Sequence, residues 1–519
     1  MKYSVNFILF LFFISCGPKS HHTTDTSHDI LIKGGLIYTG ESISAENLYV
    51  LISGDHIAYI GEKLPELIDS TVIIDATGLI VAPGFIDPHT HALGDLNNES
   101  RSHNIAFLHQ GITTVVTGND GRSPIPITTS FERWEKFGIG TNAILLVGHG
   151  QVRLNVLGDD NREPTPDELE KMKDLVRTAM QDGAFGISTG LYYAPGFFAK
   201  TEEVIELSKI VAEYDGIYDT HQRDESSYSI GLLASVEEVI RIGSEAKLPV
   251  HISHIKALGV DVWGKSDAVI TLIENARKEG IDVTANQYPY IASGTGMVEA
   301  TVPRWANAGG DEEMMNRLND PNPITKIKVE MKENIRRRGG GSSLLLTNPE
   351  NPEWKNMTLN QLAMKWNLSE VDAAIKVIQK GGSGLASFNM KESDVVSFMQ
   401  KDWVVTGSDG SINHPRKYGT FPRKIRKYAL EDSVISIGFA INQSTSRTAE
   451  IFKIPKRGKL KKGYFADVVI FDPTTITDKA WFNNPDDFSE GIEYVIVNGE
   501  IAIENGNYLG KLPGRILRK

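Results

Sequence analysis

Short apolar runs alternate with amphipathic stretches along the middle of the chain. Eight of these runs have the length and composition of buried strands, at residues 84–87, 113–117, 143–147, 184–188, 217–220, 250–253, 282–286 and 403–406. Such alternation is typical of βαβ units and a parallel sheet. Eight units in series predict an α/β fold, a closed (β/α)₈ barrel resembling a TIM barrel, with the active site at the C-terminal ends of the strands.

One intervening helix is marked at both ends. Thr165 fits an N-cap, Pro166 the first helical position and Glu168 a capping box, and Gly183 follows the end of the helix. Between these signals, apolar residues repeat at helical spacing, namely Leu169, Met172, Val176, Ala179 and Met180.

The two ends of the chain have a different sequence pattern, in which short runs rich in β-forming residues are interrupted by glycine. These runs lie at residues 30–37, 48–60 and 71–81, and again at 466–471 and 492–503. We therefore predict one small β-sandwich built from residues 29–82 and 458–519, with the barrel at residues 83–457. The barrel would carry a long insertion at about residues 291–401. In that insertion Arg336, Arg337 and Arg338 precede three glycines, which favours a helix C-terminus over an anion site.

The N-terminus has the features of an export signal. An apolar run from Val5 to Ile14 is too short for a stable transmembrane helix, and it is followed by Cys16, the single cysteine of the chain. We expect a signal peptide at residues 1–16 and a linker at 17–28. The end of the signal resembles the lipobox of bacterial lipoproteins, although Phe13 stands where Leu is usual. This resemblance implies lipidation of Cys16 and a membrane-anchored protein facing the periplasm or cell surface; the alternative is an ordinary cleaved signal.

The charge of the chain bears on its partners. The formal net charge is −12 and the sequence pI is about 5.6. A nucleic-acid surface needs clustered Lys and Arg, so this balance argues against nucleic acid and favours a small-molecule substrate. The membrane would be reached only through the lipid anchor. The pattern does not predict an oligomeric state.

Five candidate metal ligands follow four of the predicted strands. His89 and His91 come two apart after the first strand, and His221, His254 and Asp409 follow the fifth, sixth and eighth strands. Imidazole and carboxylate are ligands that zinc prefers, and an Asp beside a metal-bound water can accept its proton. Because all five arrive at the same end of a barrel, we predict a zinc site of one or two ions there.

The ordered motifs of the chain resemble the amidohydrolase superfamily, and more closely the N-acyl-D-amino-acid deacylases, or D-aminoacylases. These motifs are GFIDPHTH, GITTVVTGNDG, VGHG, GAFGISTGLYY, THQRDE, ISHIK, NQYPY, GSDG, HPRKYGTFPR and ADVVIFDP. The resemblance implies zinc-dependent hydrolysis of N-acyl-D-amino acids to a carboxylate and a free D-amino acid. It also implies that His221 and His254 are the principal zinc ligands, that His89 and His91 form a second metal position, and that Asp409 is the general base.

The chain departs from the family at one candidate ligand. Asp120 in the sequence GNDG stands where these deacylases commonly have a cysteine. A carboxylate can join two metals through its two oxygens, so we predict that Asp120 is a metal ligand and that cobalt or manganese is tolerated. The alternative is that Asp120 only caps a turn flanked by glycines.

Five further residues are candidates for binding the substrate. Lys256 lies two residues after His254 and is the sharpest candidate for the substrate carboxylate, and Tyr193, Tyr290, Ser293 and Arg223 also follow strands. The resemblance favours Lys256 and Tyr193. For Arg223, which lies in a run rich in acids, an ion pair is the stronger interpretation.

The other histidines are expected to have different roles. We interpret His251 as a packing or surface residue and place His103 and His109 as structural residues in the helix after the first strand. His149 lines the pocket or supports a loop, and His414 and Arg416 hold a loop or the substrate.

Three alternative functions remain. A cyclic-amide hydrolase of the dihydroorotase or hydantoinase type uses a carboxylated lysine on the fourth strand, but the sequence there, GAFGISTGL, has no lysine. A dipeptidase acting on D-amino-acid or isopeptide substrates needs the same site and a different acyl pocket. A catalytically dead barrel would serve as a binding lipoprotein, although such proteins usually lose ligands.

Overall fold

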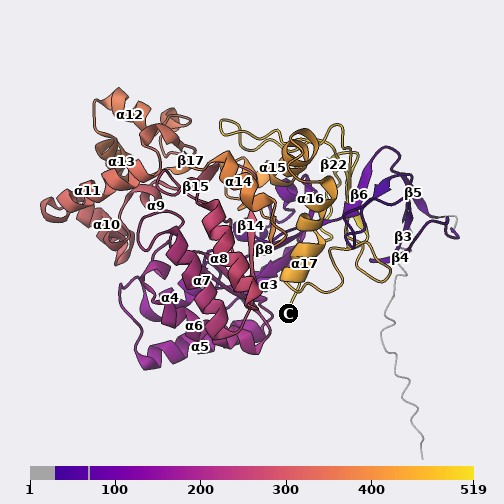
Figure 1. Cartoon of the computed structure of the whole chain (residues 1–519), viewed down its shortest axis with the longest axis horizontal. Coiled ribbons are helices and arrows are strands. Elements are labelled where there is room, and N and C mark those ends of the chain that lie inside the picture. The colour runs from indigo at the N-terminus through magenta and orange to yellow at the C-terminus, as the bar shows by residue number, and fades with distance from the viewer. Residues whose placement is uncertain (1–29, 68–69) are drawn as a thin grey trace, which may run out of the picture.

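The computed structural model describes residues 30–67 and 70–519 (Figure 1). The predicted signal peptide with Cys16 and the whole predicted linker lie outside these residues. The helices in the two described ranges all lack the combination of length and apolar character that a membrane crossing needs.

Eight parallel strands of the described chain form the barrel, and the predicted (β/α)₈ fold is confirmed. In order around the barrel they are β7 (Phe85–Asp87), β8 (Ile112–Thr117), β9 (Asn142–Leu145) with its continuation β10 (Val147–Gly148), β11 (Gly186–Gly190), β12 (Ile217–His221), β13 (Val250–Ile252), β14 (Val283–Gln287) and β18 (Val404–Thr406). The circle closes where the Asp409 N–H donates to the His89 carbonyl at 2.8 Å.

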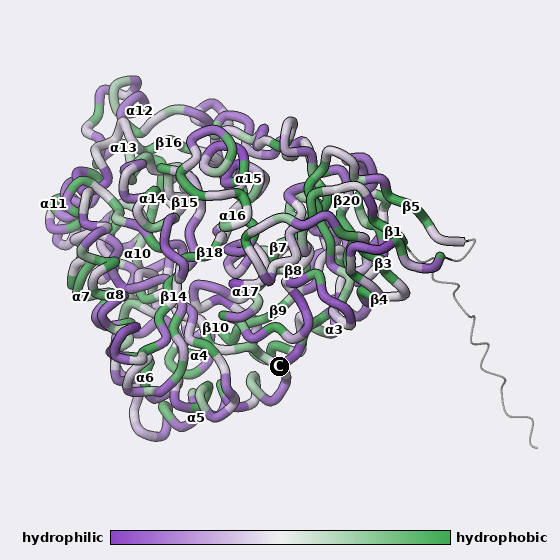
Figure 2. The backbone as a smooth tube through the Cα atoms, turned by 45° about the vertical axis from the view of Figure 1, so that its right-hand side comes forward, coloured by the Kyte–Doolittle hydropathy of each residue, from purple (hydrophilic) through white to green (hydrophobic). Residues whose placement is uncertain are grey.

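Helices cover the outside of the barrel because their apolar stripes pack onto the strands. They are α1 (Leu93–Leu96), α2 (Ile105–Leu108), α3 (Thr128–Phe137), α4 (His149–Leu157), α5 (Pro166–Gln181), α6 (Thr201–Glu213), α7 (Leu232–Ala246), α8 (Ser266–Lys278), α14 (Glu392–Met399), α15 (Arg416–Arg423), α16 (Ile437–Ser444) and α17 (Ser446–Ile451). Helix α5 begins with the predicted capping box of Thr165 and Glu168. Figure 2 shows the hydrophobic stretches running along strands such as β5 and β9.

The small domain is a pair of sheets from both ends of the chain. One sheet has the order β4 (His56–Gly61), β3 (Tyr49–Ser53), β1 (Ile30–Lys33), β5 (Val72–Asp75). The other has the order β2 (Leu36–Ile37), β6 (Ile80–Pro83), β19 (Val468–Phe471), β20 (Ile492–Val497), β21 (Glu500–Glu504), β22 (Asn507–Tyr508). Ile32 and Val50 share one core with Val468 and Ile496, so N- and C-terminal segments stabilise each other.

The insertion has a core of its own at the far end of the molecule from the sandwich (Figure 1). It contains the antiparallel sheet β15 (Ala292–Gly296), β17 (Gly384–Phe388), β16 (Leu344–Leu346) and the helices α9 (Met297–Thr301), α10 (Gly310–Asn319), α11 (Pro321–Arg337), α12 (Leu359–Trp366) and α13 (Glu370–Gln379). Helix α14 also lies within the range predicted for the insertion, but it packs on α8 and β18 of the barrel.

Candidate active site

The six candidate ligands meet at the C-terminal ends of the barrel strands. His89 and His91 follow β7, Asp120 follows β8, His221 ends β12, His254 follows β13, and Asp409 follows β18. Parallel strands bring these ends to one side of the barrel, as the sequence predicted. Their side chains are buried, except that 30% of the His91 side chain is exposed.

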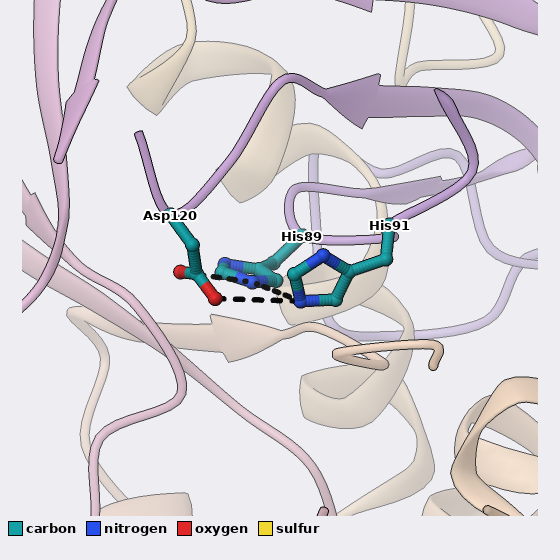
Figure 3. A group of neighbouring side chains, drawn as sticks. All are labelled: His89, His91 and Asp120. Carbon is teal, nitrogen blue, oxygen red and sulfur yellow. Dashed lines mark hydrogen bonds and ion pairs between the residues drawn. The ribbon is translucent and has the colours of Figure 1, made fainter. Parts of the chain in front are cut away.

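Asp120 lies at the centre of the cluster, with two histidines facing each of its oxygens. Its Oδ1 is 3.5 Å from His89 Nε2 and 3.8 Å from His254 Nε2. Its Oδ2 is 3.5 Å from His91 Nε2 and 3.8 Å from His221 Nδ1. Figure 3 shows the carboxylate directed at the imidazoles of His89 and His91. Each carboxylate oxygen therefore faces one histidine of the pair His89 and His91 and one of the pair His221 and His254.

The backbone at these ligands is held in an uncommon conformation. The φ angles are +52° at His91, +56° at Asp120, +37° at His254 and +49° at Asp409. Non-glycine residues adopt this region rarely, and each instance costs about 1–3 kcal/mol. Such conformations concentrate at functional sites, because there the direction of a side chain matters more than local stability.

Two buried aspartates beneath the site hold these loops. Asp87 accepts hydrogen bonds from the backbone N–H groups of His89 and Ser408, at 3.2 and 3.0 Å. Asp219 accepts from Asn119 Nδ2 at 3.0 Å and from Ser253 Oγ at 2.9 Å. Burial raises the pKa of both carboxyls to about 7. The hydrogen bonds of Asp87 and Asp219 therefore link the loops that carry the candidate ligands to one another.

The electrostatics of the site suit a cation. Burial raises the pKa of a carboxyl, yet the facing imidazoles, His89 foremost, hold the pKa of Asp120 well below its usual range. Burial lowers the pKa of His221 to about 4. Burial and Lys256 also lower the pKa of His254, but Asp409 and the other carboxylates outweigh them and raise it to about 9. The carboxylates thus dominate the local charge.

The residues present fit a bound metal. Three groups of candidate ligand atoms each lie within 4.8 Å of one another: His89 with His91 and Asp120, His89 with His254 and Asp409, and Asp120 with His221 and His254. In a tetrahedral zinc site, ligand atoms about 2.0–2.1 Å from the ion lie about 3.3 Å apart. The buried Asp120 Oδ1 has no hydrogen-bond partner among the described residues, although it lies between His89 and His254. His221 faces the same cluster with its Nδ1, which lies 2.9 Å from His254 Nε2.

A cavity of about 430 Å³ opens beside these ligands, and three predicted substrate residues line it: Lys256, Tyr193 and Ser293. The Tyr193 ring lies 4.7 Å from that of His221. Lys256 Nζ is 2.5 Å from Glu225 Oε1, and it also donates to His254 Nδ1 and the His254 carbonyl. Because all three ammonium donors are engaged, Lys256 offers the cavity its charge and no free N–H group.

The remaining two candidate substrate residues, Tyr290 and Arg223, do not line this cavity. Tyr290 packs against Phe482 outside the cavity. The alternation of side chains ends with β14 at Gln287, and Tyr288 takes the cavity position instead. Arg223 forms an ion pair with Glu238 at 2.8 Å, as its acid-rich surroundings suggested, and it does not reach the cavity.

Several cavity residues were missed or left open by the sequence. Arg416 is 1% exposed and lines the cavity, where its Nη1 lies 2.7 Å from Asp409 Oδ2 and its Nη2 donates to Ser411 Oγ. Glu225 and Tyr288 were signalled by their places in THQRDE and NQYPY, directly after strands. Arg338, which the sequence analysis assigned to a helix end, is buried in the cavity wall.

The other histidines support the fold. His251 is buried, bonds to Thr284 Oγ1 at 2.8 Å and packs against Phe452. His149, the first residue of α4, bonds to Glu203 of α6 at 2.8 Å and does not line the cavity. His414 contacts the Ala292 carbonyl at 3.2 Å. His103 and His109 flank the short helix α2 and lie outside its bounds, because that helix spans only Ile105–Leu108.

A (β/α)₈ barrel with four histidines and two aspartates gathered at its strand ends is the architecture of a metal-dependent amide hydrolase. The chain matches the family model described as "Amidohydrolase family" over residues 72–310 and 373–503, and it belongs to that family. It is a metal-dependent amidohydrolase with relatives along nearly its whole length.

Three relatives illustrate this similarity. D-aminoacylase of Alcaligenes xylosoxydans xylosoxydans is 33% identical over 519 residues, covering 95% of this chain and 98% of the relative. The structure of N-acyl-D-glutamate deacylase from Bordetella bronchiseptica, complexed with zinc and a phosphonate inhibitor, matches with a TM-score of 0.81 at 30% identity, covering 95% of this chain and 100% of that chain. A D-aminoacylase with a binuclear metal center matches with a TM-score of 0.80 at 31% identity and the same coverage.

Proposed function

We propose that this protein hydrolyses N-acyl-D-amino acids to a carboxylate and a free D-amino acid. The observation that carries the proposal is the buried Arg416, which lines the same cavity as the candidate metal ligands. The carboxylate of an N-acyl amino acid is one carbon away from its amide nitrogen, so a cation beside the metal ligands positions the amide for attack. The D configuration rests on the names of the relatives, D-aminoacylase and N-acyl-D-glutamate deacylase.

The proposed metal ligands divide into two pairs. His221 and His254 would hold the principal zinc ion, His89 and His91 a second ion, and Asp120 would be shared. A bound divalent cation supplies Lewis acidity here and lowers the pKa of a coordinated water. Imidazole and carboxylate ligands also accept cobalt or manganese, which we expect to support activity.

Asp409 is proposed as the general base. Burial raises the pKa of its carboxyl, but Arg416, His254 and other neighbours together lower it, so Asp409 is ionised and can accept a proton. It would take one proton from the attacking water as the new C–O bond forms. It would then deliver that proton to the amide nitrogen as the C–N bond breaks, so that the amine leaves neutral.

Arg416 is the proposed anchor for the substrate carboxylate. Its Nε has no hydrogen-bond partner among the described residues, whereas its Nη1 is ion-paired with Asp409 and its Nη2 donates to Ser411 Oγ. Its guanidinium lies 4.7 Å from the centroid of the Tyr288 ring. Lys256 adds positive charge, while Ser293 and Tyr193 line the remaining wall. The planar guanidinium has five N–H donors, so it can bind a carboxylate in a fixed orientation while it keeps its contacts with Asp409 and Ser411.

The direct test is a screen of N-acetyl-D- and N-acetyl-L-amino acids with zinc content measured on the same sample. We expect release of free amine from D substrates only, in proportion to bound metal. Equal turnover of L substrates would refute the stereochemical assignment. Turnover restricted to a hydantoin or dihydroorotate would refute the linear-amide assignment.

The N-terminal sequence supports a second proposal, that the protein is exported and lipidated at Cys16. Fractionation of cells that produce the full chain should place it in the membrane fraction. Cys16→Ser should release it from that fraction without changing the specific activity. A wild-type protein recovered entirely in the soluble fraction would contradict the anchor.

A further inference from the structure

A second buried arginine lines the cavity without a carboxylate partner. Arg338 follows α11 of the insertion and is 2% exposed. Its Nη2 donates to Tyr192 Oη at 3.0 Å and its Nη1 to Ser387 Oγ at 3.2 Å, while its Nε has no partner. Both partners are neutral hydroxyls, and the described residues form no ion pair with it.

This lack of a counter-charge sets Arg338 apart from three other buried arginines. Arg153 is paired with Glu203, Arg457 with Asp467, and Arg416 with Asp409. Buried Arg304 also forms no ion pair among the described residues, but it does not line this cavity. A buried cation is stable only when paired or well hydrogen-bonded, because removal from water destabilises the charge. The folded chain leaves the charge of Arg338 to be neutralised by something that enters the cavity.

The surroundings of Arg338 add further attraction for an anion. Tyr228 also lines the cavity, its hydroxyl is buried without a hydrogen-bond partner, and its ring centroid lies 5.8 Å from the Arg338 guanidinium. Arg304 lies 3.7 Å from the Tyr192 ring centroid and contributes a second positive charge behind that ring. Two unpartnered groups, one a guanidinium N–H and one a phenol, therefore lie in one wall of the cavity.

This wall is within reach of a substrate held at the metal ligands. Tyr192, the hydrogen-bond partner of Arg338, has its ring centroid 5.4 Å from that of His221. Arg338 is thus one side chain away from a proposed ligand, while Arg416, on α15, contacts Asp409. A molecule anchored by Arg416 with its amide at the metal site has one end left to meet Arg338.

We infer that Arg338 determines specificity by binding a second carboxylate of the substrate. The inference rests on the proposed function and narrows it to N-acyl amino acids with two negative charges. The second carboxylate belongs either to the amino-acid side chain, as in N-acetyl-D-glutamate, or to the acyl group, as in an N-succinyl-D-amino acid. The shared chemistry is a carboxylate on a flexible arm, and the substrates distinguish its two locations.

The test compares charged substrates with neutral isosteres, in the zinc-loaded wild type and three variants. N-acetyl-D-glutamate is paired with N-acetyl-D-glutamine, and N-succinyl-D-alanine with N-butyryl-D-alanine. Arg338→Met removes the charge, and Arg338→Lys retains it. Arg336→Met is the matched control, because Arg336 lies on the same helix end and forms ion pairs with Asp261 and Glu333 outside the cavity.

In the wild type we expect the dicarboxylate of one substrate pair, either N-acetyl-D-glutamate or N-succinyl-D-alanine, to have a higher kcat/KM than its neutral counterpart. Arg338→Met should lower that value about 10- to 100-fold through KM, with the neutral isostere changed less than about threefold. Arg338→Lys should recover part of the loss, and Arg336→Met should match the wild type. Equal losses on charged and neutral substrates, or no wild-type preference for charge, would show that Arg338 only fixes the insertion to the barrel.

A binding measurement separates this inference from the proposed function. If no N-acyl amino acid is hydrolysed, calorimetry with glutarate and butyrate tests the anion site directly. Tighter binding of glutarate that is lost in Arg338→Met supports the site even though the proposed reaction has failed. Indistinguishable binding of the two acids, or binding insensitive to Arg338→Met, overturns the inference.

Discussion

Replacement of Asp120 by asparagine tests whether two metal positions share one carboxylate. The substitution keeps the shape of the side chain and removes its charge. Each Asp120 oxygen lies 3.5–3.8 Å from imidazole nitrogens of both histidine pairs, so the loss should affect both positions. Two unit charges 4 Å apart attract by about 4 kcal/mol at an effective dielectric constant of 20. Losing most of this attraction weakens metal binding by at least about 100-fold.

The assay is metal content after equilibration with a zinc buffer, together with kcat on the best N-acyl substrate. Asp394→Asn is the matched control, because Asp394 is also a buried aspartate but lies outside the cavity and contacts none of the proposed ligands. We expect Asp394→Asn to keep its metal and Asp120→Asn to lose it. Undiminished metal content and activity in Asp120→Asn would show that Asp120 is not a metal ligand and only stabilises the turn between Gly118 and Gly121.

Three further outcomes are expected. Asp409→Asn should keep most of the zinc and lower kcat by about 10²- to 10⁴-fold, and a variant with more than about a tenth of wild-type kcat would contradict the role as base. Arg416→Met should raise KM for N-acyl amino acids far more than for N-acyl amines, measured on matched pairs; equal effects would make Arg416 structural. Burial lowers the pKa of Lys424 to about 7, so between pH 7 and about 10.5 the unfolded chain binds more protons at this residue than the folded chain does. Chemical denaturation should therefore show the wild type gaining stability relative to Lys424→Met as the pH rises, by at most about 1.4 kcal/mol per pH unit. A stability difference between the two proteins that stays constant with pH would refute this.

The barrel and the position of its ligands were predictable because each signal is local. An apolar run followed by His or Asp predicts a strand and also predicts that the polar side chain lies at the C-terminal end of that strand. Parallel topology then brings those ends together without further information. The positive φ at Asp120 and Asp409 has a local signal as well, since glycine follows each of them.

The residues of the cavity wall proposed to bind the substrate were less predictable, because their positions depend on side-chain directions beyond the ends of the strands. Tyr290 and Tyr288 differ by one strand period, but the strand ends at Gln287, so the alternation rule does not extend to them. Arg223 has several acids nearby in sequence, and only the packing of α7 selects Glu238. For Arg338 the local pattern correctly indicates the end of α11, but gives no sign that this end meets the cavity.

The structure separates the groups proposed for chemistry from those proposed for recognition. The proposed metal ligands lie at the ends of barrel strands, where buried partners such as Asp87 and Asp219 hold their loops. Arg338 belongs to the insertion, which packs around its own core and meets the barrel at the cavity. A substitution in that wall can change which substrate is bound without moving a ligand, because the two sets of side chains are held by different cores. The same barrel site can therefore serve relatives with different amino-acid preferences, and the insertion is where the preference of this chain should be sought.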